Sequence, residues 1–472
     1  MSGRRSRTGS RPGRSAWPLL VVAVGLLASA CSPAGAPTPA GSATVAATTR
    51  PAEVVAPPDT AAGAQLRWLL AATAQLPVSD SQVRAHFDAA FLAQDDAAVL
   101  NQSLQAVTGA VVRSVQVSEL NTVVAIVSAR AAAPTEVWLT VDSRGLISEL
   151  RISPATTGPT TATWDDVDAA LRSVAPQVRL LVADVSNGSC RTVHSIDPGT
   201  AAPLGSAFKL YVLDALATAV AAGKVSWAQP LTVTANLKSL PSGQLQTAPD
   251  GTKVSVQDAA AKMISISDNT AADMLINLVG RPAVEAALTT AGMADPARDQ
   301  PFLTTREMFT LKLDHWPTLA GRYIAASQAG RRALLATVVD RAPLPPVTAA
   351  TAWITPRDVN GIEWFASPTD ICHIYASLAA LARRPSLSPL AGVLQINDGG
   401  LGLNPAQWKT TWFKGGSEPG VATLTYLATT RTGHSYLVAV LAENPAAPIN
   451  QATAVPTMLS AIKGALTRAA HG

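Results

Sequence analysis

The chain has 472 residues, of which 48% are hydrophobic and only 14% are charged, so it can bury large cores and is not a disordered polymer. Its net charge is +4, and the first 14 residues hold five arginines and no acid, which leaves the remainder near neutral. No aromatic and basic stripe or known binding motif follows, so we expect no nucleic-acid partner.

The basic start runs into the apolar stretch SAWPLLVVAVGLLASAC. A positive region, a short apolar region and small residues in this order are typical of a secretory signal, and the apolar part is short for a membrane span. LASAC resembles a bacterial lipobox, with Ala28 where leucine is more usual. We expect a signal peptide over 1–31 and lipidation of Cys31, hence a cell-membrane lipoprotein facing outside. If the lipobox interpretation fails, the alternatives are a secreted protein or an uncleaved anchor.

Export changes how the other two cysteines are interpreted. Cys190 and Cys372 would lie outside the reducing cytosol, where a disulfide is allowed. The sequence does not show whether they are close in space, so a disulfide and two buried free thiols both stay open.

Residues 32–60 are rich in Pro, Ala, Ser and Thr and show no helical or alternating period, which predicts a disordered tether. A first domain follows over 61–156, with helical spacing over 64–75 and 79–94 and then strands over 111–119, 122–131 and 136–154. Helices followed by a strand meander predict a small α+β domain, and the pattern resembles the nuclear-transport-factor-2-like fold. It shows no convergent histidine or acid set, so we expect a structural or docking domain.

The second predicted domain covers 160–472. An acidic-start helix over 164–175 and a hairpin over 178–196 begin it, and helices dominate its middle. The end of the chain has strands over 409–416, 420–430 and 434–444 and a helix over 451–470. We therefore expect one antiparallel sheet assembled from both ends of this domain, with a helical subdomain inserted between them.

The stretch PLGSAFKLYVL places Ser206 three residues before Lys209, at the start of a run that is apolar almost all round. In such a buried helix the ammonium of Lys209 would be desolvated, which favours a neutral amine that can take the hydroxyl proton of Ser206. The alternative is a helix cap followed by a lysine that reaches solvent. The spacing alone does not decide, because Ser460 and Lys463 repeat it.

Two further motifs favour the catalytic interpretation. Ser267-Asp268-Asn269 follows about sixty residues downstream, and Lys414-Gly415-Gly416 stands in a late strand. Ser-x-x-Lys, Ser-Asp-Asn and Lys-[Thr/Ser]-Gly in this order form the signature of class A β-lactamases and penicillin-binding proteins. The chain therefore resembles a β-lactamase-related serine hydrolase. With its first domain, it is similar to two-domain actinobacterial lipoproteins, which include the cephalosporin-esterase-like protein of clavulanate clusters.

The resemblance implies roles for the residues of these motifs. Ser206 would attack an acyl carbonyl and Lys209 would accept its proton. Ser267 would relay a proton toward the leaving group, helped by the charge of Lys414. Asn269 would hold Lys209 and a substrate amide.

The resemblance also implies an oxyanion hole and a substrate-binding strand. The backbone N–H groups of Ser206 and Ser417 would form the hole. Asn269 and Lys414 would bind substrate together with Gly415 and Gly416. Gly415 stands where the family has Thr or Ser to contact a substrate carboxylate, which favours an uncharged acyl ester.

A second departure concerns release of the acyl group. The family's Glu-x-x-x-Asn loop, whose glutamate activates water, has no match between Asn269 and Lys414. Glu307 and Glu363 are the acids of segment 281–364 that we would nominate, and neither has the neighbours of that motif.

Competing enzyme classes find no support in the sequence. There is no Gly-x-Ser-x-Gly elbow, and the six histidines are scattered without the spacing of metal ligands. We expect a serine hydrolase without a cofactor or metal that acts on a small β-lactam, ester or peptidoglycan-derived substrate. The alternatives are a D-Ala-D-Ala peptidase of the cell wall, a slow penicillin-binding lipoprotein without turnover, and a docking protein.

Overall fold

The structure is a computed structural model, and it describes residues 54–92, 97–118, 121–129, 134–155, 161–404 and 406–471. The predicted signal peptide, its Cys31 and most of the predicted tether lie outside these residues. Within the described part of the chain, no helix combines the length and the apolar character that a membrane span requires.

The first part of the described chain has helices followed by a strand meander, as predicted. Its helices are α1 (Ala61–Ala72), α2 (Asp80–His86), α3 (Ala89–Leu92) and α4 (Ala97–Leu104). Its strands are β1 (Val111–Ser118), β2 (Thr122–Ser128), β3 (Thr135–Val141) and β4 (Ile147–Pro154), which form one antiparallel sheet in the order β1-β2-β3-β4. The apolar cluster of this part draws only on residues between 61 and 152. The likeness to the nuclear-transport-factor-2-like fold stays a prediction.

The prediction of a single helix over 79–94 is wrong in one respect. The chain leaves the helical conformation after α2, where Phe87 has an extended backbone and bridges to Ile147 at the start of β4. Phe87 is 1% exposed, so burying this ring in the core outweighs the helical preference of the flanking residues.

The second part of the chain has the sheet that the sequence predicts. Five strands run in the order β11-β12-β13-β5-β6, so strands from both ends of this region are neighbours. The bounds are β5 (Gln177–Asp184), β6 (Arg191–Ile196), β11 (Trp408–Glu418), β12 (Val421–Thr430) and β13 (Ser435–Glu443). The central pair β13 and β5 is antiparallel, with Val438 opposite Val182. Neighbouring strands β12 and β13 are buried along most of their length, which predicts cover on both faces of the sheet.

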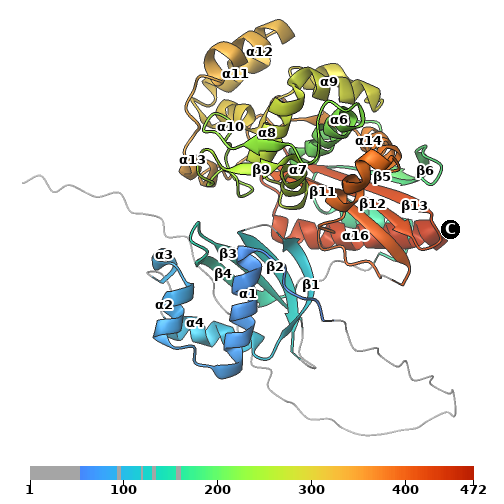
Figure 1. The fold of residues 1–472 in the computed structure, drawn as a ribbon. Helices are drawn as coiled ribbons and strands as arrows, with labels where there is room; N and C mark the ends of the chain where they lie inside the picture. Colours follow the sequence, from blue (N-terminus) through green and yellow to red (C-terminus); the bar gives the residue numbers. More distant parts are fainter. Residues whose placement is uncertain are drawn as a thin grey trace, which may run out of the picture. The chain divides into compact units, whose positions relative to one another are not determined.

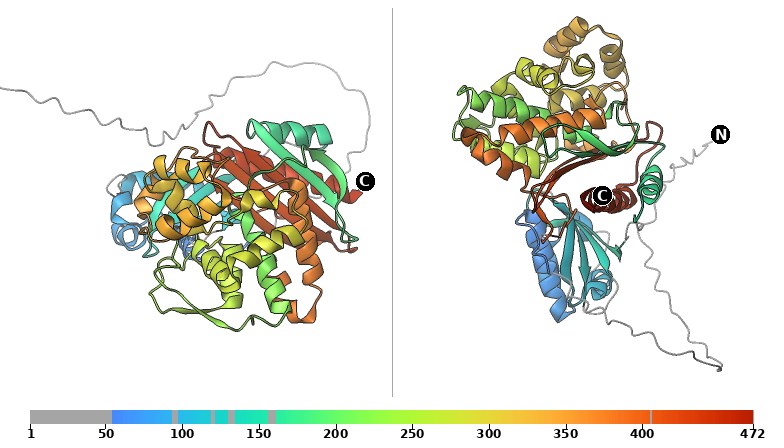
Figure 2. Two further views of the ribbon diagram at one scale, coloured as in Figure 1. Left: turned by 90° about the horizontal axis from the view of Figure 1, so that it is seen from above. Right: turned by 90° about the vertical axis from the view of Figure 1, so that its right-hand side faces the viewer.

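Helices cover both faces, as Figure 2 shows. One face packs against α5 (Trp164–Arg172) and the long final helix α16 (Gln451–His471). The other face packs against α6 (Lys209–Ala221) and α14 (Pro368–Leu381) in the larger apolar cluster. The candidate catalytic residues lie at this second face.

The helical subdomain fills the sequence between β6 and β11 (Figure 1). Its further helices are α7 (Val256–Ser265), α8 (Asn269–Val279), α9 (Arg281–Thr290), α10 (Thr305–Leu313), α11 (Thr318–Ala325), α12 (Gln328–Leu334), α13 (Val347–Thr351) and α15 (Ser388–Leu394). Two short antiparallel ladders were not predicted, and they pair β7 (Ala202–Pro203) with β10 (Phe365–Ala366) and β8 (Pro230–Thr232) with β9 (Lys253–Ser255). The first ladder holds segment 363–366 beside the turn that carries Ser206.

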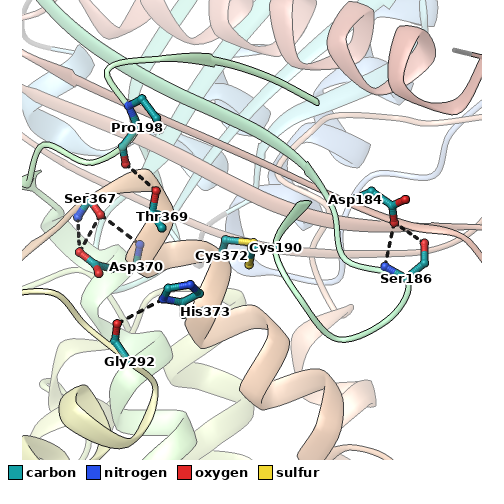
Figure 3. Close-up of a disulfide and its surroundings, with 10 residues drawn as sticks. All are labelled: Asp184, Ser186, Cys190, Pro198, Gly292, Ser367, Thr369, Asp370, Cys372 and His373. Carbon is teal, nitrogen blue, oxygen red and sulfur yellow. Dashed lines mark hydrogen bonds between the residues drawn. A yellow bond between two sulfur atoms is a disulfide. The ribbon is translucent and has the colours of Figure 1, made fainter. Parts of the chain in front are cut away.

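Cys190 and Cys372 form a disulfide, which decides between the two alternatives left open by the sequence (Figure 3). Their Cα atoms lie 6.1 Å apart, although 182 residues separate them in the chain. Cys190 comes directly before edge strand β6 and Cys372 lies in the first half of α14. The bond therefore fastens the edge of the sheet to a helix of the core.

Candidate active site

Ser206 lies in a 3-10 turn, Gly205–Phe208, that leads into α6. Its side chain makes no capping bond to the helix that follows, so the simple N-cap alternative does not describe it. The sequence suggests that Ser206 lies in the first turn of the α-helix. In the structure it lies one turn earlier, because α6 begins only at Lys209. In this 3-10 turn, Ser206 lines a cleft.

Lys209 is fully buried, and its side-chain nitrogen is held by the residues named by the motifs. Nζ lies 3.1 Å from the Ser206 hydroxyl oxygen, 3.0 Å from the Ser267 hydroxyl oxygen and 2.6 Å from Asn269 Oδ1. It also donates to the backbone carbonyl of Ser267 at 2.6 Å. A lysine reaching for solvent would be exposed, whereas Lys209 is 0% exposed, so the structure excludes that alternative.

Ser267 is presented by a backbone conformation that serine rarely adopts. Its φ is +57°, in the left-handed region. This conformation costs energy for a residue with a side chain, and it persists only where surrounding contacts hold it in place. The next residue supplies that constraint, because the Asp268 carboxylate accepts from the N–H groups of Gln244, Leu245 and Ala271 at 2.6, 2.9 and 2.8 Å. The Ser267 hydroxyl is thereby fixed between two lysines.

Asn269 begins α8 and is held from two sides. Its Nδ2 donates to the carbonyl of Leu240 at 3.0 Å, and an amide nitrogen carries a second N–H that can meet a substrate carbonyl. The Thr305 hydroxyl oxygen lies 3.3 Å from the backbone carbonyl oxygen of Asn269 and 2.9 Å from Asp273 Oδ1, so its one proton is available to either acceptor. Burial raises the pKa of Asp273 to about 7, against the N–H groups of Arg306 and Thr305 that stabilise its charged form.

Lys414 reaches the same point from strand β11. Its Nζ lies 3.1 Å from the Ser267 hydroxyl oxygen and 2.8 Å from the Gly415 carbonyl oxygen. Ser267 is therefore in contact with both Lys209 and Lys414. The structure brings together Ser206, Lys209, Ser267, Asn269 and Lys414, which are the five side chains singled out in the sequence.

Glycines let strand β11 approach the nucleophile turn closely. A Cβ on Gly416 would lie 2.2 Å from the Leu204 carbonyl oxygen and 2.4 Å from the Ser206 nitrogen. A Cβ on Gly205, whose φ is +50°, would lie 2.6 Å from the Ser417 nitrogen. The two backbone segments that carry the N–H groups of Ser206 and Ser417 are therefore close neighbours, and the assignment of these groups to an oxyanion hole stays a prediction.

The position of Gly415 has little room for the Thr or Ser that the β-lactamase-related family carries there. A Cβ there would lie 2.9 Å from the Phe413 ring and 3.2 Å from the Thr423 carbonyl oxygen, so a larger residue would need Phe413 to move. Gly415, Gly416 and Lys414 all line the cleft that contains Ser206.

The two acids nominated from segment 281–364 have different places. Glu307 is buried in an ion pair with Arg281 at 2.5 Å and caps α10, and it does not line the cleft. Glu363 does line the cleft, and its Oε2 accepts from the N–H of Gly205 at 3.2 Å. Sequence reasoning missed its neighbours Lys312 and Glu418, which carry no motif and stand 106 residues apart.

The repeated spacing at Ser460 and Lys463 lies elsewhere. Both residues are inside α16, which packs on the other face of the sheet, and neither lines the cleft. Among the described residues, no group of three or more His, Cys, Asp or Glu side chains is arranged to hold a metal ion.

Two families match parts of the sequence. Residues 162–342 match the Beta-lactamase enzyme family, and residues 57–147 match the family described as ORF 12 gene product N-terminal. The first match includes Ser206, Lys209, Ser267 and Asn269 and ends before Lys414. No curated protein is detectably similar to the chain.

Solved structures resemble about two thirds of the chain at low identity. A β-lactamase from Sphaerobacter thermophilus is 20% identical, covers 66% of this chain and 98% of its own, and has a TM-score of 0.47. PBP-A is 18% identical over 66% of this chain and 100% of its own, with a TM-score of 0.44. A β-lactamase from Chitinophaga pinensis is 18% identical over 65% of this chain and 98% of its own, with a TM-score of 0.43.

Proposed function

We propose that the chain is a serine acyl hydrolase that forms an acyl-enzyme on Ser206 with β-lactam or acyl-ester substrates. The observation that carries this proposal is the contact of 3.1 Å between the Ser206 hydroxyl and the buried Nζ of Lys209. A buried amine beside a serine hydroxyl can accept its proton as the oxygen attacks a carbonyl carbon.

The remaining residues have places that fit the later steps. The developing oxyanion would be bound by the N–H groups of Ser206 and Ser417. The Ser267 hydroxyl, which lies between Lys209 and Lys414, would pass a proton to the leaving group. Asn269 would hold the acyl amide while it holds Lys209.

The substrate class that fits best is an uncharged acyl ester, as in the esterase-like proteins that the sequence resembles. Gly415 offers no hydroxyl to a substrate carboxylate, and the Phe413 ring and the Thr423 carbonyl crowd the position where one would stand. β-Lactams would acylate Ser206 through the same groups. The alternative is a cell-wall peptidase or a slow penicillin-binding lipoprotein that keeps the acyl group.

The test is to incubate the purified protein with a chromogenic cephalosporin and, separately, with a nitrophenyl acyl ester. Intact mass and peptide mapping are recorded at each time point. We expect an acyl adduct on Ser206 with both probes, rapid turnover of the ester and slow release of the lactam product. A lasting adduct with both probes would favour the penicillin-binding alternative, and neither adduct nor turnover would reject the enzyme.

The localisation is proposed from the sequence of the leader. If Cys31 carries the lipid, the variant Cys31→Ala should move the protein from the membrane fraction to the soluble fraction of the producing cells. The reason is that membrane attachment would depend on acyl chains on that thiol. Cell fractionation with immunodetection measures the change, and an unchanged distribution would contradict lipidation at Cys31.

A further inference from the structure

Three charged side chains are buried together behind the nucleophile turn. Lys312 of α10 is 0% exposed, Glu363 is 5% exposed, and the side chain of Glu418 at the end of β11 is 4% exposed. Charged groups are rarely buried so completely unless they are paired, and this cluster has two acids for one base.

Each acid is attached to one side of the proposed oxyanion hole. Glu363 Oε2 accepts from the N–H of Gly205 at 3.2 Å and from the N–H of Trp364 at 3.0 Å. Gly205 directly precedes Ser206. Glu418 directly follows Ser417, and both of its oxygens lie 2.6 Å from Lys312 Nζ.

The two carboxyls lie beside the same lysine and affect one another. Glu363 Oε1 is buried and accepts no N–H or O–H from the described residues, and the charges of Lys312 and Glu363 both act on Glu418. Two ionised carboxylates have only acceptors, so a hydrogen bond between them would require one proton. One shared proton also balances the charge, since a single carboxylate then faces the single ammonium of Lys312.

The groups around the pair favour retention of this proton. Burial raises the pKa of both Glu363 and Glu418, whereas Lys312 acts in the opposite direction on each. Burial, together with repulsion from Glu363, raises the pKa of the neighbouring Asp299 well above its usual range, which favours the neutral form of Asp299 beside the pair. The pair therefore keeps a proton at a pH where a lone exposed glutamate has lost it, and loses it as the pH rises.

The backbone between the two attachments has no slack. Strand β11 at Gly416 and Ser417 is in contact with the turn at Gly205 and Ser206, where even one added Cβ would overlap. We propose that Glu363 and Glu418 share one proton and act as a positioning pair, which holds the N–H groups of Ser206 and Ser417 at the spacing that the oxyanion hole requires. The proposal rests on the proposed function for its effect on rate.

Loss of the shared proton should open the hole. Two buried carboxylates in contact repel one another, and each pulls on the backbone segment to which it is attached. Acylation of Ser206 should therefore slow at alkaline pH, as the pair loses its proton to hydroxide and Gly205 separates from Ser417.

The experiment compares Glu363→Ala, Glu363→Gln and the control Glu443→Gln, with the acylation rate constant measured by nitrophenyl ester burst across pH. Glu443 is another buried carboxylate with an unpaired oxygen, in an ion pair with Arg179 at 3.1 Å, and it does not line the cleft. Glu363→Ala should lower the rate about tenfold or more at every pH, since loss of a whole oxyanion donor costs about 10²–10³.

Glu363→Gln should restore most of that loss and remove the decline at alkaline pH. A glutamine can accept from Gly205 with its oxygen and donate to Glu418 with its nitrogen, and it has no proton to lose. Glu443→Gln should keep the alkaline decline of the wild type. A decline that persists unchanged in Glu363→Gln, or that also disappears in Glu443→Gln, would overturn the proposal.

A second measurement does not depend on activity. Difference infrared spectroscopy should show a protonated carboxyl component in the wild type that fades as the pH rises and is missing in Glu363→Gln, whereas the component of Asp273, whose pKa burial raises to about 7, is present in both proteins. A band that is identical in the two proteins would overturn the shared proton. If the band behaves as expected and Ser206 takes no acyl group, the proposed function fails while the shared proton stands.

Discussion

Replacing Ser206 by alanine is expected to abolish the acyl adduct, and replacing Lys209 by methionine is expected to slow its formation by about 10²–10⁴-fold. Ser206 supplies the oxygen that carries the acyl group, so no adduct can form on alanine at that position. Methionine keeps the length and apolar stem of Lys209 but removes the amine that lies 3.1 Å from the hydroxyl. Single-turnover intact-mass measurements with a nitrophenyl ester give both results.

The chain contains its own matched controls for this pair. Ser460→Ala and Lys463→Met alter the same spacing in α16, on the other face of the sheet, and burial lowers the pKa of Lys463. Both control variants should acylate within about twofold of the wild type, as expected for residues outside a site. Acylation of Lys209→Met at more than a tenth of the wild-type rate would argue against Lys209 as the base.

The second large effect concerns stability. The variant Cys190→Ala/Cys372→Ala should lose about 5 kcal/mol of unfolding free energy on chain-entropy reasoning, because the disulfide closes a loop of 182 residues. Alanine is used in place of serine because Cys372 is 0% exposed, and a serine hydroxyl there would be buried without a hydrogen-bond partner. The measurement is the urea midpoint at which the protein can no longer be acylated, which reports on the part of the chain that contains the proposed active site.

Reductant supplies the control for this variant. It should bring the wild type down to the midpoint of the double variant and leave the double variant where it is. Equal midpoints for both proteins in oxidising buffer would show that the bond contributes nothing to stability. Acylation in the absence of urea should change little, since neither cysteine lines the cleft.

The motifs allowed the site to be predicted because each one carries its chemistry within a few residues. Ser206 and Lys209 lie one turn apart, Ser267 and Asn269 flank a helix start, and Lys414 precedes two glycines. Their order along the chain joined them before any distance was known. The five-stranded sheet was predictable for a similar reason, since its strands are apolar runs bounded by turn residues.

What the sequence did not predict depends on contacts between distant segments. Lys312 lies in the stretch TLKLD, where nothing distinguishes it from a lysine on a helix surface. Its partner Glu418 is 106 residues away, so the sequence gives no sign that the two are paired. The pairing of Cys190 with Cys372 likewise depends on tertiary placement. The break in the helix at Phe87 arises because its ring is buried and its backbone bridges to Ile147.

The pairing of strands from both ends of the catalytic part has a consequence for biosynthesis. Ser206 and Lys209 leave the ribosome about 200 residues before Lys414 and Ser417, and β5 must wait for β13 to become its neighbour. Long-range pairing of this kind makes the sheet late to form. On the proposed function, a growing chain carries Ser206 before Ser417 is in place to complete the proposed oxyanion hole, and esters cannot acylate Ser206 until the last strands have arrived.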